Sequence, residues 1–317
     1  MKYLSVLTCT ILLSFSSTYS QKLKRHDDII YGRALNWQNI QLDLKLDLVY
    51  PNGHKNLPLV LMIHGGGFFR GIKEDQRSVC EMLAKRGFAV ANLEYRQGFD
   101  RSPTGFQTGI ALAVYRAQQD AAAALRYLVH HAEEFAIDTS FIFIGGESAG
   151  GVTALGRSYI SQGEWDLALP LLHHELGSID SSGNSLADRY ILKGVINLWG
   201  GIPDTGMISK TELMSIPVLM VHSTDDEQIP FEQSSHPYVI YTTLQGSYDI
   251  AQRFKNNGGC YILNYIQGAR HAYGFSQQFV VDAISQFAQN VMAGKCISEE
   301  KENKDGDINR FFLEYQK

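Results

Sequence analysis

Residues 141–151 read FIFIGGESAGG, a short apolar run that is followed at once by a serine between glycines. Four consecutive apolar residues of this kind are typical of a strand buried on both faces, and the stretch after Ser148 is compatible with a helix. A G-x-S-x-G pattern between a strand and a helix is typical of a nucleophile elbow, a strained turn that exposes the serine hydroxyl. Gly146 and Gly150 would let neighbouring backbone approach without a Cβ clash. Ser148 is therefore the candidate nucleophile, and an ordinary tight turn is the alternative.

Strands and helices alternate on both sides of this stretch. Strands are predicted over residues 42–48, 59–63, 88–93, 141–144, 192–198, 218–221 and 261–265, and helices over 77–86, 112–134, 247–256 and around 280–291. In the first strand apolar and charged residues alternate, so Asp43, Lys45 and Asp47 are expected on a wet face. Strands alternating with helices at these lengths predict an α/β fold with a mostly parallel central sheet and helices on both faces.

The composition excludes several classes of protein. A chain of 317 residues, 44% hydrophobic and 19% charged, can bury a full core, which excludes a disulfide-stapled miniprotein or a disordered tail protein. The formal net charge is −5 and the basic residues cluster only at residues 22–25, so neither nucleic acid nor an anionic membrane is an expected partner. The four cysteines show no C-x-x-C spacing, which argues against a structural zinc or thioredoxin-like site. No metal or organic cofactor is expected.

The N-terminal residues have the pattern of a signal peptide. Lys2 precedes an apolar run over residues 3–15, and Thr18 and Ser20 are small enough for the positions before a cleavage site. A run of this length is too short for a bilayer core of about 30 Å, so no stable membrane insertion is expected, with a retained anchor as the alternative. The sequence therefore predicts a signal peptide over residues 1–20 and a secreted or periplasmic protein.

Removal of that peptide would leave three cysteines in an oxidising compartment. An odd number permits at most one disulfide among Cys80, Cys260 and Cys296. The pair expected to form it is Cys260 with Cys296.

The remaining chain is predicted to form one domain over residues 31–293, because no repeat or Pro-rich linker divides it. Residues 157–188 lie between a helix and a strand without a regular pattern, and they are a candidate cap insertion over the site. Apolar residues in this segment, such as Trp165 and Leu172, could line a substrate pocket or pack in the core. Residues 294–317 alternate in charge and are predicted to be a solvated C-terminal tail.

A glycine-rich loop follows the predicted strand over residues 59–63 and reads HGGGF from His64 to Phe68. Acyl transfer builds an oxyanion that needs two or three preorganised N–H donors. The N–H groups of Gly66 and Gly67 could supply two of them, and that of Ala149, next to the candidate nucleophile, a third. Phosphate binding is the competing use of such a loop, and it is disfavoured because neither G-x-x-x-x-G-K-S/T nor G-x-G-x-x-G is present.

The acid that would orient a catalytic base has three neighbouring candidates. A serine hydroxyl needs an imidazole base that a carboxylate orients, and after a nucleophile elbow the order along the chain is Ser, acid, His. Residues 221–230 read VHSTDDEQIP and follow a predicted buried strand. Asp226 is the candidate acid, Asp225 is the alternative, and Glu227 is expected to be solvated.

Two histidines follow the candidate acid, His236 and His271. His271 lies in the sequence GARHA between the last predicted strand and the last predicted helix, a loop from which a base could reach Ser148. His236 lies in an irregular stretch and is the weaker candidate. His64 is expected to shape the glycine loop rather than to act as a base.

With HGGGF, GESAGG and HSTDDEQIP in this order, the chain resembles the α/β-hydrolases of the esterase and lipase group. The resemblance covers residues 42–293 and is closest to small secreted bacterial carboxylesterases similar to feruloyl esterases and to hormone-sensitive-lipase-like esterases. It implies an α/β-hydrolase fold, with the acid at Asp226, the base at His271 and oxyanion donors at Gly66 and Gly67. One departure is the sequence YRQG that begins at Tyr95, where the hormone-sensitive-lipase-like pattern continues as Y-R-L-A-P.

These features predict a serine carboxylic-ester hydrolase that acts through an acyl-enzyme without a cofactor. Its expected substrate is a small or polysaccharide-linked ester, including the feruloyl and acetyl types. A serine exopeptidase on the same fold and a catalytically silent binding protein are the alternatives. Labelling of Ser148 by a fluorophosphonate probe would separate an active enzyme from a silent binder.

Overall fold

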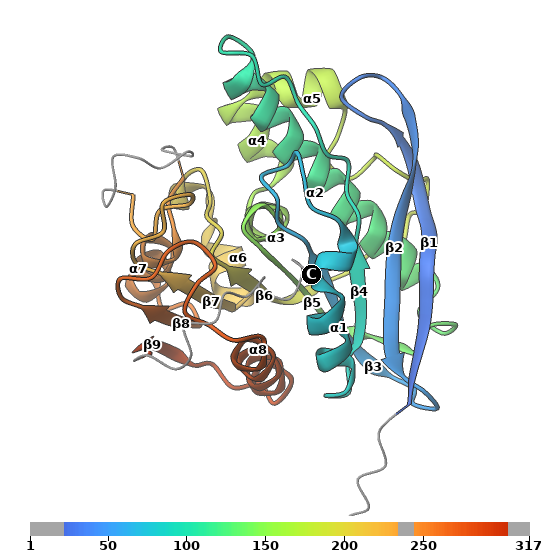
Figure 1. The fold of residues 1–317 in the computed structure, drawn as a ribbon, viewed down its shortest axis with the longest axis vertical. Coiled ribbons are helices and arrows are strands. Elements are labelled where there is room, and N and C mark those ends of the chain that lie inside the picture. The colour runs from blue at the N-terminus through green and yellow to red at the C-terminus, as the bar shows by residue number, and fades with distance from the viewer. Residues whose placement is uncertain (1–21, 234–243, 304–317) are drawn as a thin grey trace, which may run out of the picture.

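A twisted sheet runs through the molecule and carries helices on both faces (Figure 1). The computed structural model describes residues 22–233 and 244–303. The predicted signal peptide over residues 1–20, His236 and residues 304–317 of the predicted tail lie outside the described residues. None of the helices in the described ranges is long and apolar enough to cross a membrane.

Nine strands of the described residues form one sheet in the order β1-β2-β4-β3-β5-β6-β7-β8-β9. The strands are β1 (Leu23–Leu35), β2 (Gln41–Pro51), β3 (Leu57–Ile63), β4 (Ala89–Leu93), β5 (Ile137–Glu147), β6 (Leu192–Leu198), β7 (Val218–Ser223), β8 (Tyr261–Ile266) and β9 (Ser298–Glu302). β2 is antiparallel to both of its neighbours, and every other pair is parallel. The predicted α/β class with a mostly parallel sheet is confirmed. The carboxyl ends of β3, β5, β7 and β8 therefore meet at one edge, the usual place for a site in such folds.

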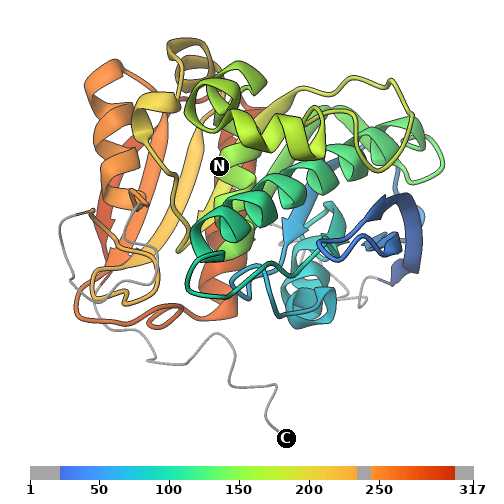
Figure 2. The same cartoon turned by 90° about the horizontal axis from the view of Figure 1, so that it is seen from above.

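The helices divide between the two faces of the sheet (Figure 2). They are α1 (Arg77–Ala84), α2 (Phe106–His130), α3 (Ala149–Tyr159), α4 (Gln162–Ala168), α5 (Pro170–Leu176), α6 (Lys210–Ser215), α7 (Ser247–Asn257) and α8 (Gln277–Met292), with short 3-10 turns η1 (Lys73–Gln76) and η2 (Thr205–Met207). Successive side chains of β3 point to opposite faces of the sheet and belong to two different apolar clusters. Leu61 lies in the cluster with residues of α2, α3 and α7, and Met62 lies in the cluster with residues of α1 and α8. α4 and α5 lie in the candidate cap segment, and α5 packs against α2.

The sheet begins earlier than the sequence predicts. β1 pairs with β2 in antiparallel register from Leu23 onward, so the domain starts before Tyr31. Asp47 of β2 is also not on a wet face, because its side chain is 4% exposed and one oxygen lies 2.9 Å from Lys73 Nζ. The buried ammonium of Lys73 covers this part of the strand, which alternation alone could not indicate.

The sheet also ends later than the sequence predicts. The segment predicted as a solvated tail contains β9, which pairs with β8 in parallel, so the domain extends beyond Ala293. The predicted disulfide between Cys260 and Cys296 is present and ties the start of β8 to the start of β9. Cys80 is buried and outside any disulfide. The charge alternation of this segment therefore indicates an exposed edge strand rather than a tail.

Candidate active site

Ser148 lies in the turn between β5 and α3, at the edge of the sheet where the parallel strands end. Its backbone adopts φ 53° and ψ −118°, a strained conformation for a residue with a side chain. The flanking glycines fit the turn against the end of β3, because a Cβ on Gly146 or Gly150 would lie 2.4 or 1.9 Å from the carbonyl oxygen of Ile63. The sequence pattern and the local geometry therefore agree on a constrained serine, whose side chain is partly exposed.

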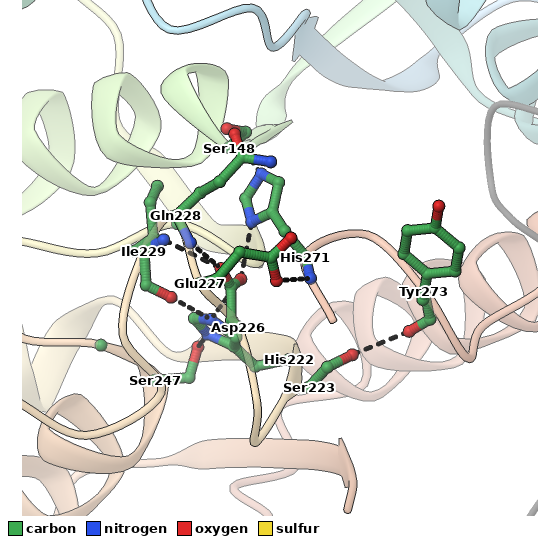
Figure 3. A network of polar contacts seen from close by, with 12 residues as sticks. Ser148, His222, Ser223, Asp226, Glu227, Gln228, Ile229, Ser247, His271 and Tyr273 are labelled. Carbon is green, nitrogen blue, oxygen red and sulfur yellow. Dashed lines mark hydrogen bonds and ion pairs between the residues drawn. The ribbon is translucent and has the colours of Figure 1, made fainter. Parts of the chain in front are cut away.

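The structure brings Ser148, His271 and Asp226 together from three separate loops (Figure 3). His271 Nε2 lies 2.9 Å from Ser148 Oγ, and His271 Nδ1 lies 2.6 Å from Asp226 Oδ2. A carboxylate can only accept, so Nδ1 carries the proton and Nε2 accepts from the serine hydroxyl. This is the arrangement that a serine nucleophile needs for activation by a base.

Asp226 is buried and ionised. Burial raises the pKa of its carboxyl, but hydrogen bonds from His222 and His271 more than offset this and hold the pKa well below its usual range. The second oxygen, Oδ1, accepts the backbone N–H groups of Gln228 and Ile229 at 2.8 and 2.9 Å. Four donors therefore converge on one carboxylate.

The neighbouring carboxylates have different surroundings. Asp225 is exposed and accepts a hydrogen bond from Thr224, so it does not reach His271. Glu227 is exposed, but its Oε2 accepts the backbone N–H of His271 at 3.2 Å. Glu227 is therefore solvated as expected, and in addition it anchors the loop that carries the base.

His222 is a buried residue of the site that sequence reasoning missed. Its Nε2 lies 3.1 Å from Asp226 Oδ2, and its Nδ1 lies 2.7 Å from Ser247 Oγ. Asn197 orients this contact, because the N–H of Gly200 donates to Asn197 Oδ1 and the amide nitrogen then faces Ser247 Oγ at 3.0 Å. Ser247 accepts from Asn197 and donates to Nδ1, so Nε2 of His222 carries the proton that Asp226 accepts. The motif VHSTDDEQIP contains this histidine, but only the fold shows its partners.

The glycine loop after β3 faces Ser148. Gly66 has φ 111°, and a Cβ on it would lie 1.9 Å from the carbonyl oxygen of Arg70, so only glycine fits. His64 is fully buried, its Nδ1 lies 2.7 Å from the carbonyl oxygen of Gly65, and its ring stacks on Tyr95. His64 therefore shapes the loop, as predicted. Ala149 opens α3, so its N–H belongs to the first turn, where no intrahelical acceptor exists.

Glu147, next to the nucleophile, is a buried carboxyl group. Burial raises its pKa to about 8, and a hydrogen bond from Gln76 Nε2 at 2.9 Å acts weakly in the opposite direction. The side chain is therefore neutral at pH 7. It adds no negative charge beside Ser148, where one would oppose the formation of an oxyanion.

Two cavities lie beside the nucleophile turn, one lined by Ser148 and the other by Ala149. One, of about 340 Å³, is mainly apolar and lies between α2, the start of α3 and the α4–α5 segment. Ala149, Val152, Trp165 and Leu172 are among its lining residues, so the candidate cap borders this cavity. The other, of about 620 Å³, is more polar and is lined by the glycine loop together with Ser148 and His271.

Solved structures share this architecture over most of the chain. Esterase 2 of Thermogutta terrifontis, phosphoramylated by tabun, is 19% identical, with a TM-score of 0.60 over 84% of this chain and 94% of that chain. A truncated carbohydrate esterase from gut microbiota is 18% identical, with a TM-score of 0.57 over 85% and 96%. Esterase B of Lactobacillus rhamnosis, solved with a tributyrin phosphonate, is 19% identical, with a TM-score of 0.57 over 86% and 87%. The chain therefore has the α/β-hydrolase fold.

Residues 46–165 of the chain match the model of the BD-FAE family, an esterase family. No curated protein matches the chain. The matched range contains the glycine loop and Ser148 but ends before Asp226 and His271. Among the described residues of the chain, no group of three or more His, Cys, Asp or Glu side chains could hold a metal ion.

Proposed function

We propose that this protein is a serine carboxylic-ester hydrolase that acts through an acyl-enzyme. The observation that carries the proposal is the unbroken series of hydrogen bonds from Ser148 through His271 to Asp226, with the serine in a strained turn. A positioned base and an oriented carboxylate together account for several powers of ten in rate. The resemblance in fold to esterases supports the same reaction class.

In the first half of the reaction, His271 Nε2 takes the proton of Ser148 while Oγ attacks the ester carbonyl carbon. The negative charge moves to the carbonyl oxygen, and the N–H groups of Gly66, Gly67 and Ala149 stabilise it. Asp226 stabilises the imidazolium that forms. The tetrahedral intermediate then collapses, the ester C–O bond breaks, and the alcohol leaves with the proton from His271.

In the second half, water attacks the acyl-enzyme with His271 again as the base. The intermediate releases the carboxylic acid, and Ser148 regains its proton. Every proton transfer in both halves uses His271, so the sequence of steps is complete with this chain's own residues and water.

The two cavities suit the two parts of an ester. His271 must protonate the leaving oxygen, and it lines the polar cavity but not the apolar one. The alcohol part is therefore assigned to the polar cavity and the acyl part to the apolar cavity beside Ala149. An apolar cavity of about 340 Å³ suits an alkyl or hydroxycinnamoyl group, and a wide polar cavity suits a sugar. Small or polysaccharide-linked esters, including feruloyl and acetyl types, are the proposed substrates.

The proposed location is outside the cytoplasm, secreted or periplasmic. The signal-peptide pattern over residues 1–20 supports this location. The disulfide between Cys260 and Cys296 supports it as well, because such bonds persist in oxidising compartments.

The test is hydrolysis of acetyl, butyryl, octanoyl and feruloyl esters by the protein, with Ser148→Ala as the matched control. We expect hydrolysis by the wild type, loss of activity by at least about a thousandfold in the variant, and an unchanged far-UV spectrum. A fluorophosphonate probe should label the wild type and not the variant. Equal hydrolysis of para-nitrophenyl acetate by both proteins would overturn the assignment.

A further inference from the structure

Four arginine side chains stand apart from the others in the described residues. Within residues 22–233 and 244–303, Arg70, Arg101, Arg189 and Arg270 are exposed and their guanidinium groups make no hydrogen bond or ion pair, whereas each of the other arginines has at least one such partner. Three of the four, Arg70, Arg101 and Arg270, line the polar cavity that contains Ser148. Three of the four unpaired arginines in the described residues of this acidic chain therefore gather at its candidate active site.

An exposed aromatic ring contacts two of these arginines. Phe69 is 40% exposed, and its ring centroid lies 5.5 Å from Arg70 Cζ and 4.9 Å from Arg101 Cζ. Phe69 lines the same cavity. The contacts keep both guanidinium groups beside one apolar surface, and their N–H donors remain open to solvent.

The carboxyl groups that line the polar cavity do not pair with its three arginines. Asp75 accepts the backbone N–H of Ile72 at 3.1 Å, and Glu227 accepts that of His271 at 3.2 Å. Glu147 is neutral at pH 7, because burial raises its pKa to about 8. The described carboxylates of the cavity therefore form no ion pair with Arg70, Arg101 or Arg270.

We propose that the polar cavity binds esters whose alcohol part carries a carboxylate, such as an acidic saccharide. The proposal rests on the esterase function, because the protonation of the leaving alcohol by His271 places that part of the substrate in this cavity. A guanidinium group matches a carboxylate with two parallel hydrogen bonds, and three of them at one cavity attract an anion over several ångströms. Phe69 supplies a flat apolar surface for the ring that bears the carboxylate.

The test compares two esters of the same shape and different charge. Para-butanoyloxybenzoate carries a carboxylate on its alcohol part, and para-butanoyloxybenzamide carries a neutral amide in the same place. We expect the wild type to have the higher kcat/KM for the carboxylate ester. The combined variant Arg70→Gln, Arg101→Gln, Arg270→Gln should lower the ratio of the two kcat/KM values about tenfold. Salt at about 1 M, where the screening length is about 3 Å, should lower the wild-type ratio in the same direction.

Arg189→Gln is the matched control, because Arg189 is also exposed and without a hydrogen bond in the described part of the chain but lines neither cavity. This variant should keep the wild-type ratio. The wild type and the combined variant could instead show an equal ratio of the two kcat/KM values while both hydrolyse the two esters in a Ser148-dependent way. That result would overturn the carboxylate site and leave the esterase function intact. Failure of the wild type to hydrolyse either ester or para-nitrophenyl butyrate above the level of Ser148→Ala would instead overturn the esterase function.

Discussion

Asp226 depends on two histidines, and only one of them contacts the nucleophile. Replacement of His222 by Ala removes one of its four donors, and a hydrogen bond to a charged group is worth about 1.5–3 kcal/mol. We expect kcat to fall about tenfold because Asp226 then holds His271 less firmly. KM should change little, because His222 lines neither cavity. Steady-state kinetics on para-nitrophenyl butyrate would measure both constants.

The pH profile separates this positioning role from a structural one. Without the His222 donor, more of the negative charge of Asp226 acts on His271 and favours its protonated form, so the variant should lose activity at a higher pH than the wild type as the pH falls. His174→Ala, at an exposed histidine, is the control and should match the wild type. An unchanged kcat and an unshifted acid limb, with only the melting temperature lowered, would assign His222 to the fold alone.

Glu147 makes the stability of the fold depend on pH. Burial raises its pKa to about 8, whereas a glutamate in an unfolded chain has a pKa of about 4.3. Between these values the folded state keeps a proton that the unfolded state has released, so the free energy of unfolding falls as the pH rises through this window. The side chain of the variant Glu147→Gln cannot titrate, so this pH dependence is lost. The free energy of unfolding of the variant relative to that of the wild type should therefore increase from about pH 5 to about pH 8 and then level off. Urea unfolding across this range is the measurement, and a pH-independent difference would contradict the expectation.

At the scale of single elements, the fit between α3 and β3 sets the position of the nucleophile. A methyl group on Gly150 would lie 1.9 Å from the carbonyl oxygen of Ile63, so Gly150→Ala must displace the start of α3. We expect a loss of about 1–3 kcal/mol in the free energy of unfolding, together with reduced activity. Gly163→Ala in α4 is the control, because its methyl group would meet nothing closer than 3.9 Å. That variant should be as stable as the wild type or slightly more stable, since alanine favours a helix.

The central elements could be predicted from the sequence because each carries a local pattern. The strand over residues 192–198 was predicted with its observed bounds, and the three triad residues follow strands that end at the same edge. β1 could not be predicted in the same way, because LKRHDDIIYGRAL mixes charged and apolar residues and is stabilised by its pairing with β2. The partners of His222 and Glu227 could not be predicted from the sequence either, because they lie far away along the chain. Glu227 and its partner His271 are 44 positions apart.

At the scale of the whole molecule, the apolar cavity should limit the length of the acyl chain. Its wall joins α2 to the α4–α5 segment, and Ala111 of α2 is one of the small residues that line it. Ala111→Phe fills part of this volume, so the ratio of kcat/KM for octanoyl over acetyl esters should fall about tenfold. Ala187→Phe, at an exposed alanine outside both cavities, should keep the wild-type ratio. A ratio that is equal in both variants would mean that the acyl chain lies elsewhere.

The last strand also bears on how the protein behaves in concentrated solution. All five residues of β9 are exposed, and four of them are charged, Glu299, Glu300, Lys301 and Glu302. A strand from another copy that paired with this border would have to strip water from these groups and bring like charges together. The backbone hydrogen-bonding groups at the free edge of β9 could otherwise pair with another copy. The charged side chains of β9 therefore protect the protein from ordered aggregation at this end of the sheet.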